Sequence, residues 1–258
     1  MAKAFLIDMD GVLVRGSALI AGAEAFLERL NGEGRPYVIF TNNSRYTPDM
    51  LSERLIKIGL MVSPAHIFSS AIATAIFLDH QQAGGSVYAV GGPGLHAALA
   101  EVAYRLDDEK PDFVVLGEPI TFDIAAVTRA MQLIQRGARF ITTNPDVVDP
   151  GEKGIEPACG AVAAMISAAT GVQPYAIGKP NPLMMRCALN RLGVRASEAV
   201  IVGDRMDTDI VAGMESGLET VLVLSGVTRR EDIDRFSYRP DHVRESVKAL
   251  VDEEGFWE

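Results

Sequence analysis

The chain has 258 residues, of which 48% are hydrophobic and 22% charged, so it can form one large globular domain or two smaller ones. Its 24 basic and 34 acidic residues give a net charge of −10 without a basic stripe, which argues against a nucleic-acid polymer as partner. No apolar run reaches the ~18 residues needed to cross a bilayer. The two cysteines, Cys159 and Cys187, provide no disulfide framework. We therefore expect a cytoplasmic protein without membrane contact.

Short apolar runs alternate with amphipathic stretches along the chain. The runs lie at 4–7, 37–40, 87–90, 113–116, 139–142, 175–177, 199–202 and 220–224. The amphipathic stretches lie at 22–33, 48–59, 71–81, 94–104, 122–136, 159–170, 181–192 and 208–216. Unbroken runs rich in Val and Ile, separated by helices, are typical of βαβ units, so the sequence predicts an α/β fold with parallel sheets. The polar segment 237–258 is expected to pack loosely at its end.

The first apolar run is followed by two nearby carboxylates, Asp8 and Asp10, and then by Gly11. In open α/β sheets, ligands bind just past the carboxyl ends of the strands. Two acids at this spacing repel each other, which points to a cation between them or to one acid that keeps its proton. A simple turn is the alternative, because Asp and Gly both favour turns.

Three later runs are also followed by polar groups. These candidates are Thr41, Asn42 and Asn43 after 37–40, Lys179 after 175–177, and Asp204 and Asp209 after 199–202. Carboxylates, amides, a hydroxyl and a lysine suit a hard divalent cation and a phosphate group. Zinc is disfavoured because no His or Cys lies among them.

These candidates fall in 8–11, 41–44, 179 and 203–209, and the block 85–172 contributes none of them. Since that block holds its own strands and helices, we interpret it as an inserted domain, with 1–84 and 173–258 forming the catalytic core. Gly84 and Gly85 mark a hinge at its start. Its exposed surface could support a homodimer.

The inserted block contains patterns with competing interpretations. Gly91 to Gly94 follow a strand and precede a helix, but they lack the full spacing of a dinucleotide-binding loop, so a turn is favoured. Cys159 stands at a helix start, where a thiolate would be stabilised, yet no His partner is evident nearby. Asn144 and Asp146 could face a substrate or form an Asn-Pro-Asp turn.

Four segments, DMDGV, TNN, GKP and GDRMDTD, occur in this order, and each follows a predicted strand. They resemble the four motifs of the haloacid dehalogenase superfamily of phosphohydrolases. The middle block resembles the large cap of the group that includes NagD-type and p-nitrophenyl phosphatases, and the stretches 143–146, 157–161 and 224–227 are also similar to NagD-type proteins. The resemblance implies a Rossmann-like core with an inserted α/β cap.

The resemblance also implies roles for the carboxylates. Asp8 would be the nucleophile that forms an aspartyl-phosphate, and Asp10 would act first as general acid and then as general base. Mg²⁺ would be held by Asp8, by Asp204 and by Asp10 through its main-chain carbonyl. Asp209 would support this metal site.

The remaining candidates would bind the substrate. Thr41, Asn42 and Asn43 would contact the phosphate group, and Lys179 would neutralise developing negative charge and hold Asp8 as an anion. From the cap, Asn144 and Asp146 would contact the leaving group.

The resemblance implies a Mg²⁺-dependent phosphatase of small phosphorylated metabolites, with nucleoside monophosphates as the first candidates. Phosphoglycolate, sugar phosphates, pyridoxal phosphate and p-nitrophenyl phosphate remain open as substrates. Phosphoryl transfer to a sugar, as in phosphomutases, and a catalytically silent sensor of phosphorylated metabolites are the alternatives. A nucleophile beside an acid argues against the sensor, because a binding protein has no use for that pair.

Overall fold

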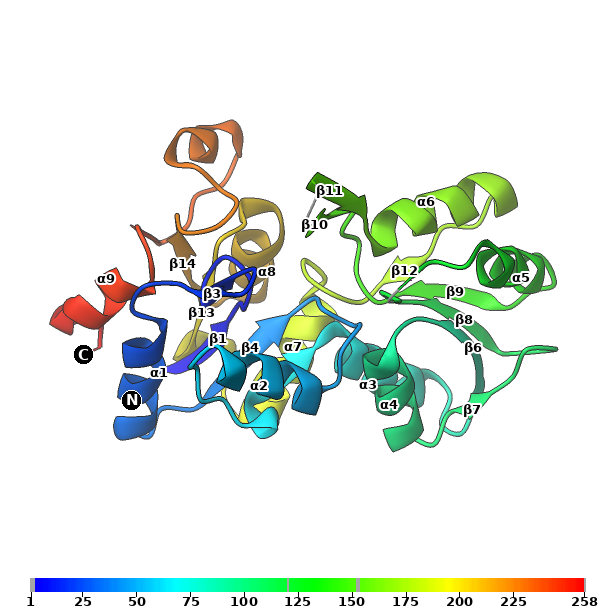
Figure 1. Cartoon of the computed structure of the whole chain (residues 1–258), viewed down its shortest axis with the longest axis horizontal. Helices are drawn as coiled ribbons and strands as arrows, with labels where there is room; N and C mark the ends of the chain where they lie inside the picture. Colours follow the sequence, from blue (N-terminus) through cyan, green and yellow to red (C-terminus); the bar gives the residue numbers. More distant parts are fainter. Residues whose placement is uncertain (1–2, 120, 152–153, 258) are drawn as a thin grey trace. The chain divides into compact units, whose positions relative to one another are not determined.

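The computed structural model describes residues 3–119, 121–151 and 154–257. The chain divides into two compact units. The core unit comprises residues 1–41, 48–68 and 179–258, and the inserted unit comprises 42–47 and 69–178. Each unit contains a sheet flanked by helices (Figure 1), which confirms the predicted α/β fold with parallel sheets. Within the described ranges, no helix combines the length and the apolar character needed to span a membrane.

The core unit is built on a six-stranded sheet in the order β15-β14-β13-β1-β4-β5. Its strands are β1 (Ala4–Ile7), β4 (Tyr37–Thr41), β5 (Ile67–Ser69), β13 (Ala199–Gly203), β14 (Glu219–Val223) and β15 (His242–Arg244). Strand β1 pairs in parallel with β13 on one side and β4 on the other. All four of its side chains are buried, which explains why its sequence shows no polar alternation.

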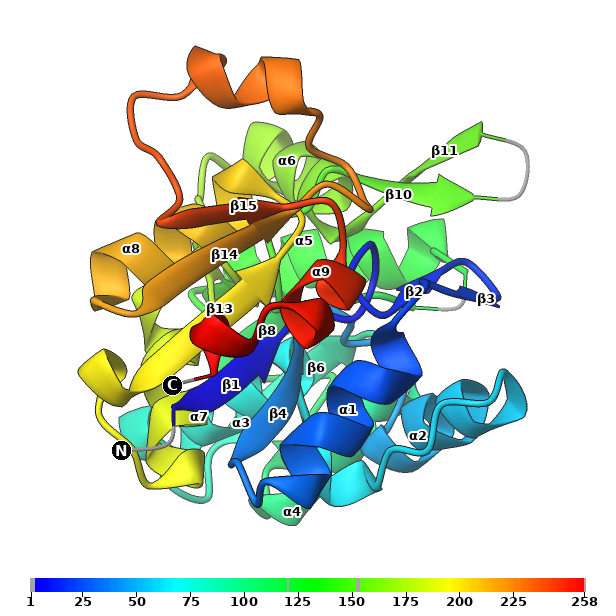
Figure 2. The same ribbon diagram turned by 90° about the vertical axis from the view of Figure 1, so that its left-hand side faces the viewer.

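Helices cover both faces of the core sheet. Helices α1 (Ala23–Gly32) and α9 (Val247–Asp252) lie on one face, and α7 (Pro182–Leu192) and α8 (Val211–Ser216) lie on the other (Figure 2). Helix α2 (Pro48–Lys57) and the small hairpin of β2 (Val14–Arg15) and β3 (Ala18–Leu19) complete this unit. Helix α7 begins where the Asn181 side chain accepts a hydrogen bond from the Leu183 amide, because Asn is a favoured capping residue at helix starts.

The end of the C-terminal segment is packed, so the expectation that 237–258 packs loosely at its end is wrong. Trp257 is only 5% exposed, and its ring centroid lies 5.6 Å from that of Phe5 and 5.7 Å from that of Phe26. Its indole N–H donates to the carbonyl of Leu250 at 2.6 Å. The aromatic residues at the end of this polar segment anchor it to the core.

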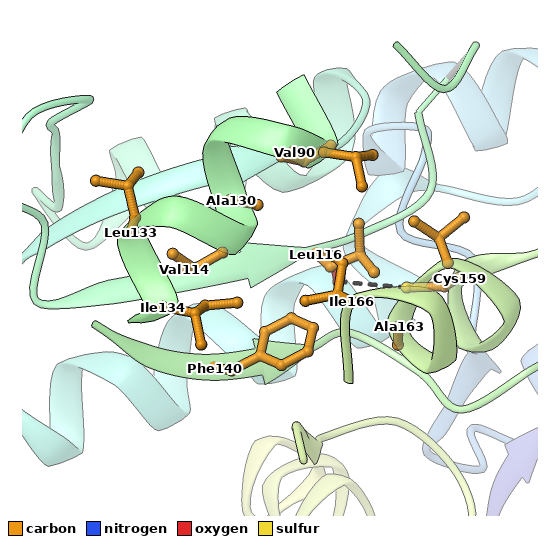
Figure 3. Close-up of a cluster of buried hydrophobic side chains, with 12 residues drawn as sticks. Val90, Val114, Leu116, Ala130, Leu133, Ile134, Phe140, Cys159, Ala163 and Ile166 are labelled. Carbon is orange, nitrogen blue, oxygen red and sulfur yellow. Dashed lines mark hydrogen bonds between the residues drawn. The ribbon is translucent and has the colours of Figure 1, made fainter. Parts of the chain in front are cut away.

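The inserted unit has a five-stranded sheet in the order β12-β9-β8-β6-β7. Its strands are β6 (Ser86–Val90), β7 (Arg105–Leu106), β8 (Phe113–Leu116), β9 (Arg139–Thr142) and β12 (Tyr175–Ala176). Helices α3 (Ser70–Gln81) and α4 (Pro93–Glu101) cover one face, and α5 (Ile124–Gln135) and α6 (Cys159–Thr170) cover the other (Figure 1). Val114, Leu116, Phe140 and Ile166 fill the space beneath α5 and α6 (Figure 3). A hairpin of β10 (Val148–Gly151) and β11 (Gly154–Pro157) precedes α6.

The inserted unit extends further than the predicted block 85–172: it includes residues 69–178 and the loop 42–47. Helix α3 belongs to it because Ala71 and Ala75 pack against Ala98 of α4. Strand β12 belongs to it because Tyr175 pairs with Ile141 of β9. The glycines at 84 and 85 therefore lie inside this unit, and the chain leaves the core unit earlier, after Phe68.

Candidate active site

Three carboxylates of the core unit come together at the ends of neighbouring strands. Asp8 follows β1, Asp204 follows β13, and Asp209 lies in the π-helical turn Met206–Ile210. Because β1 and β13 run parallel, their carboxyl ends lie at the same edge of the sheet. Carboxylate oxygens of the three residues lie within 4.8 Å of one another.

Lys179 lies among these carboxylates and is only 3% exposed. Its Nζ donates to Asp8 Oδ1 at 2.6 Å, to Asp209 Oδ1 at 2.8 Å and to the carbonyl of Phe40 at 3.0 Å. Burial lowers the pKa of Lys179, but the charges of Asp209 and Asp8 outweigh burial, and the pKa is raised above its ordinary value. The ammonium group is therefore a permanent cation that fixes one oxygen of Asp8.

The carboxylates are not balanced by this single cation. Burial raises the pKa of Asp8 well above its ordinary value despite the attraction of Lys179, and the charges of Asp209 and Asp204 raise it further. Burial and the Asp209 carboxylate likewise raise the pKa of Asp204 to about 7. Three carboxylates around one ammonium leave an excess of negative charge, which favours a cation at this site.

Two glycines border the Asp204 carboxylate. Gly11, at a φ of 82°, and Gly226 lie so close that a Cβ at either position would collide with it. The amide of Val227 donates to Asp204 Oδ2 at 2.6 Å, and Ser225 Oγ donates to the carbonyl of Gly11 at 2.7 Å. The segment 225–227 was not among the predicted site residues, although its signal was present: small residues follow an apolar run.

The other Asp204 oxygen, Oδ1, is buried and accepts no hydrogen bond from the described residues. A buried carboxylate oxygen without a partner is costly unless a ligand completes it. This oxygen and the excess negative charge fit Mg²⁺, which Asp8 and Asp204 would hold. The side chain of Asp10 is exposed, and it is not part of the carboxylate group. Metal binding through the main-chain carbonyl of Asp10 stays a prediction.

The predicted phosphate-binding residues lie where the chain passes from one unit to the other. Thr41, at the end of β4, is 3% exposed and belongs to the core unit, whereas Asn42 and Asn43 belong to the inserted unit. Asn43 Oδ1 accepts from the amides of Arg45 and Tyr46 at 3.1 and 3.2 Å, so this side chain shapes the turn that follows. Contacts of these residues with phosphate stay predictions.

The structure brings Asn42, Asn144 and Asp146 together within the inserted unit. Asn42 Nδ2 donates to Asp146 Oδ2 at 2.8 Å, and Asn144 Nδ2 donates to the carbonyl of Asn42 at 2.9 Å and to Glu118 Oε1 at 2.7 Å. Asn144 is fully buried, and its Oδ1 accepts from the Asp146 amide at 3.1 Å. Both donors of Asn144 are thus used within the protein, and its predicted contact with a leaving group stays untested.

Two other patterns of the inserted unit have structural roles. Burial raises the pKa of the Cys159 thiol to about 12, and its Sγ lies 2.8 Å from Thr142 Oγ1, so no reactive thiolate forms at this helix start. In the glycine-rich loop, a Cβ at Gly92 or Gly94 would collide with the main chain at Arg45 or Tyr46. These glycines allow the loop 42–47 to approach closely.

Comparison with known proteins defines the family. A haloacid dehalogenase-like hydrolase family model matches residues 5–105, and a HAD-hydrolase-like model matches residues 176–250. The chain therefore belongs to the haloacid dehalogenase-like hydrolases and, within them, to the group of phosphatases that includes NagD and the p-nitrophenyl phosphatases.

Individual relatives cover nearly the whole chain. Dihydroxyacetone phosphatase of Corynebacterium glutamicum (strain R) is 50% identical over 96% of this chain and 90% of that protein. Acid sugar phosphatase of Staphylococcus aureus (strain USA300) is 40% identical over 97% of each chain. The structure of NagD from E. coli K-12 is 39% identical, with a TM-score of 0.90 over 96% of this chain and 97% of that chain. The p-nitrophenyl phosphatase from Archaeoglobus fulgidus is 34% identical, with a TM-score of 0.90 over 97% and 98%.

Proposed function

We propose that this protein is a Mg²⁺-dependent phosphatase of small phosphate monoesters, with Asp8 as its nucleophile. One observation carries the proposal: an Asp8 carboxylate held by the buried ammonium of Lys179, beside two further carboxylates that favour a cation. Held this way, one oxygen of Asp8 is engaged and the other is available to attack phosphorus. When bound, Mg²⁺ would offset the charge repulsion between these carboxylates and an anionic substrate.

The proposed reaction has two steps. In the first, an Asp8 oxygen bonds to phosphorus, the bond from phosphorus to the ester oxygen breaks, and Asp10 gives its proton to that oxygen. In the second, Asp10 takes a proton from water, whose oxygen bonds to phosphorus as the acyl phosphate bond breaks. Asp8 returns to a carboxylate and inorganic phosphate leaves. The exposure of Asp10 suits a group that must meet both leaving group and water.

For the substrate, we favour short phosphorylated sugars and trioses such as dihydroxyacetone phosphate. The names of the relatives that are 50% and 40% identical support this choice over the nucleoside monophosphates expected from the sequence. The likeness to NagD keeps nucleotides as the second candidate. A cytoplasmic location fits such metabolites and stays a prediction, as does a homodimer through the inserted unit.

The test is release of inorganic phosphate by the purified chain, with Mg²⁺ or with EDTA. We expect activity on p-nitrophenyl phosphate that requires Mg²⁺. We also expect a higher kcat/KM for dihydroxyacetone phosphate than for hexose phosphates, phosphoglycolate and nucleoside monophosphates. A higher kcat/KM for a nucleotide would overturn the substrate assignment but would leave the assignment as a phosphatase unchanged. Transfer of phosphate to an added sugar in place of water would identify a mutase.

Asp8→Asn and Asp241→Asn separate chemistry from folding. Asp241 accepts hydrogen bonds from the amide and hydroxyl of Thr220, at 2.8 Å each, and has no part in the proposed reaction. Asp8→Asn should abolish turnover and Asp241→Asn should retain it. An active Asp8→Asn variant, or an enzyme indifferent to EDTA, would overturn the mechanism.

A further inference from the structure

A buried carboxyl group that the proposed reaction does not use lies in the inserted unit. Glu118 follows β8 by two residues and is only 5% exposed. Burial above all, and then the charge of Asp149, raise its pKa from the ordinary 4.5 to about 7, although the hydrogen bonds from Asn144 and Ser44 and the charge of Arg45 act to lower it. A buried carboxyl is costly, so its place in the fold requires an explanation.

Among the residues that the structure describes, two groups donate hydrogen bonds to the Glu118 side chain. Oε2 accepts from the amide of Ser44 at 3.1 Å, and Oε1 accepts from Asn144 Nδ2 at 2.7 Å. The Glu118 amide returns a bond of 2.9 Å to Ser44 Oγ, which also accepts from Thr143 Oγ1 at 2.9 Å. Ser44 itself is fully buried. Glu118 therefore fixes the backbone and the side chain of Ser44.

The same carboxyl also controls Asn42 through Asn144. The second donor of Asn144 goes to the Asn42 carbonyl, which receives another bond of 2.6 Å from Ser70 Oγ. The loop Asn42–Ser44 is thereby held at its first residue and at its third. It follows directly after Thr41 in the chain, so its conformation decides where the Asn42 amide points.

We propose that Glu118 is a positioning residue for phosphate binding: through Ser44 and Asn144 it fixes the Asn42–Ser44 backbone in the conformation that receives the phosphate group. This inference rests on the proposed phosphatase function. Glu118 makes no contact with a reacting atom in the proposed reaction. It supplies two acceptor oxygens to two donors, and a shift of the loop is the consequence of removing either oxygen.

Glu118→Gln is the sharpest change, because it keeps the shape but replaces one acceptor oxygen with a donor nitrogen. Either the Ser44 amide or Asn144 Nδ2 then faces a donor and loses its partner. Glu101→Gln is the matched control, since Glu101 is exposed at the end of α4.

Three quantities are measured for wild type and both variants in Mg²⁺: kcat/KM for p-nitrophenyl phosphate, the inhibition constant of inorganic phosphate, and hydrogen exchange of the peptide covering 42–47. For Glu118→Gln we expect about a tenfold weaker inhibition by phosphate, corresponding to one lost hydrogen bond, at least the same loss in kcat/KM, and faster exchange in that peptide. Glu101→Gln should match wild type in all three.

A folded Glu118→Gln variant that binds phosphate as wild type does would overturn the proposal, even if its unfolding midpoint falls, because a purely structural role predicts that result. Should Glu118→Gln fail to fold, Glu118→Asp decides by the same inhibition constant: a severalfold increase supports the proposal and an unchanged value refutes it. If wild type itself releases no phosphate, the phosphatase assignment fails, and exchange in 42–47 still reports whether Glu118 holds the loop.

Discussion

Replacing Asp8 with asparagine should abolish turnover and leave the protein at least as stable as wild type when no metal is present. The reason is the shared charge at the site, where three carboxylates surround one ammonium group. Most substitutions of a buried, hydrogen-bonded carboxylate destabilise a protein. At Asp8 the opposite sign is expected, because the surroundings oppose its negative charge.

The electrostatic energies at Asp8 follow from its distances to the neighbouring charged groups. Attraction between Asp8 Oδ1 and Lys179 Nζ, 2.6 Å apart, is about 6 kcal/mol at an effective dielectric constant of about 20. Repulsion from Asp204 and Asp209, with oxygens within 4.8 Å, is at least about 3 kcal/mol for each. Attraction and repulsion therefore nearly cancel, and burial of the charge decides the balance against ionisation. The raised pKa of Asp8 expresses that balance.

The raised pKa of Asp8 also determines whether the free energy of unfolding rises or falls with pH. Because the folded state holds the proton of Asp8 more tightly than the unfolded chain does, the free energy of unfolding falls as the pH rises above the ordinary pKa of 3.8. The free energy of unfolding is measured with urea in EDTA at pH 5 and pH 8. The stability of Asp8→Asn relative to wild type should be higher at pH 8 than at pH 5. In saturating Mg²⁺, wild type should be the more stable of the two proteins. A bound ligand at a hundredfold excess over its dissociation constant adds about 2.7 kcal/mol to the free energy of unfolding.

Asp241→Asn is expected to change the stability in the opposite direction from Asp8→Asn. Burial raises the pKa of Asp241, but its hydrogen bonds from Thr220 outweigh burial and lower the pKa, so loss of this charge should destabilise the protein by about 1 kcal/mol. If Asp8→Asn is destabilised in EDTA as Asp241→Asn is, or gains as much from Mg²⁺ as wild type, the reasoning on charge at the active site is refuted.

Three further outcomes are expected. Gly226→Ala should lower kcat/KM and Mg²⁺ affinity by about 10- to 100-fold, measured by metal titration, because a Cβ there collides with the Asp204 carboxylate; unchanged affinity would contradict this. Wild type should lose up to about 3 kcal/mol of unfolding free energy more than Glu118→Gln between pH 4.5 and about 7, because the folded state holds the Glu118 proton more tightly. Parallel pH profiles in urea would contradict that shift. Trp257→Ala should cost about 3 kcal/mol in urea unfolding because the ring packs on Phe5 and Phe26; a near-neutral result would mean that the C-terminal segment is not an anchor.

Most strands with four or more residues and buried apolar side chains could be predicted from the sequence, whereas most of the polar or very short strands could not. Runs such as Phe113–Leu116 have every side chain buried, and their bounds agree with the structure. Strand β7 has two exposed residues, and β15 has three half-buried residues, so neither contains an apolar run. Pairing with a neighbouring strand determines these short elements, and such pairing is not visible in the local sequence.

The extent of the inserted unit could not be predicted because the assignment followed the reactive residues. Helix α3 contains no reactive residue, and its small buried side chains Ala71 and Ala75 give no sign of which sheet they face. The partner, Ala98 of α4, is far along the chain. Packing between helices decided the boundary, whereas Gly84 and Gly85 only turn the chain inside the unit.

That Asp8, Asp204 and Asp209 lie close together could be expected from the sequence, because each comes after an apolar run that forms a strand of the core sheet. Glu118 shows the same signal after Phe113–Leu116, but within the block 85–172 the sequence analysis assigned contacts with a substrate only to Asn144 and Asp146. Its partners Ser44 and Asn144 are 74 and 26 positions away, so the sequence alone could not reveal what this carboxyl holds.

Hydrogen-bond satisfaction distinguishes the buried polar cluster around Glu118 from the buried carboxylates around Asp8. In the inserted unit, both oxygens of Glu118 and both donors of Asn144 have protein partners, so that cluster is complete and serves to hold a backbone. In the core unit, Asp204 Oδ1 lacks a partner among the described residues, and the Lys179 ammonium does not balance the three carboxylates near it. A buried carboxylate group that is left incomplete in this way is costly, and a bound cation would complete it. For this reason we assign the chemistry to the carboxylates around Asp8 and the positioning of the phosphate-binding loop to Glu118.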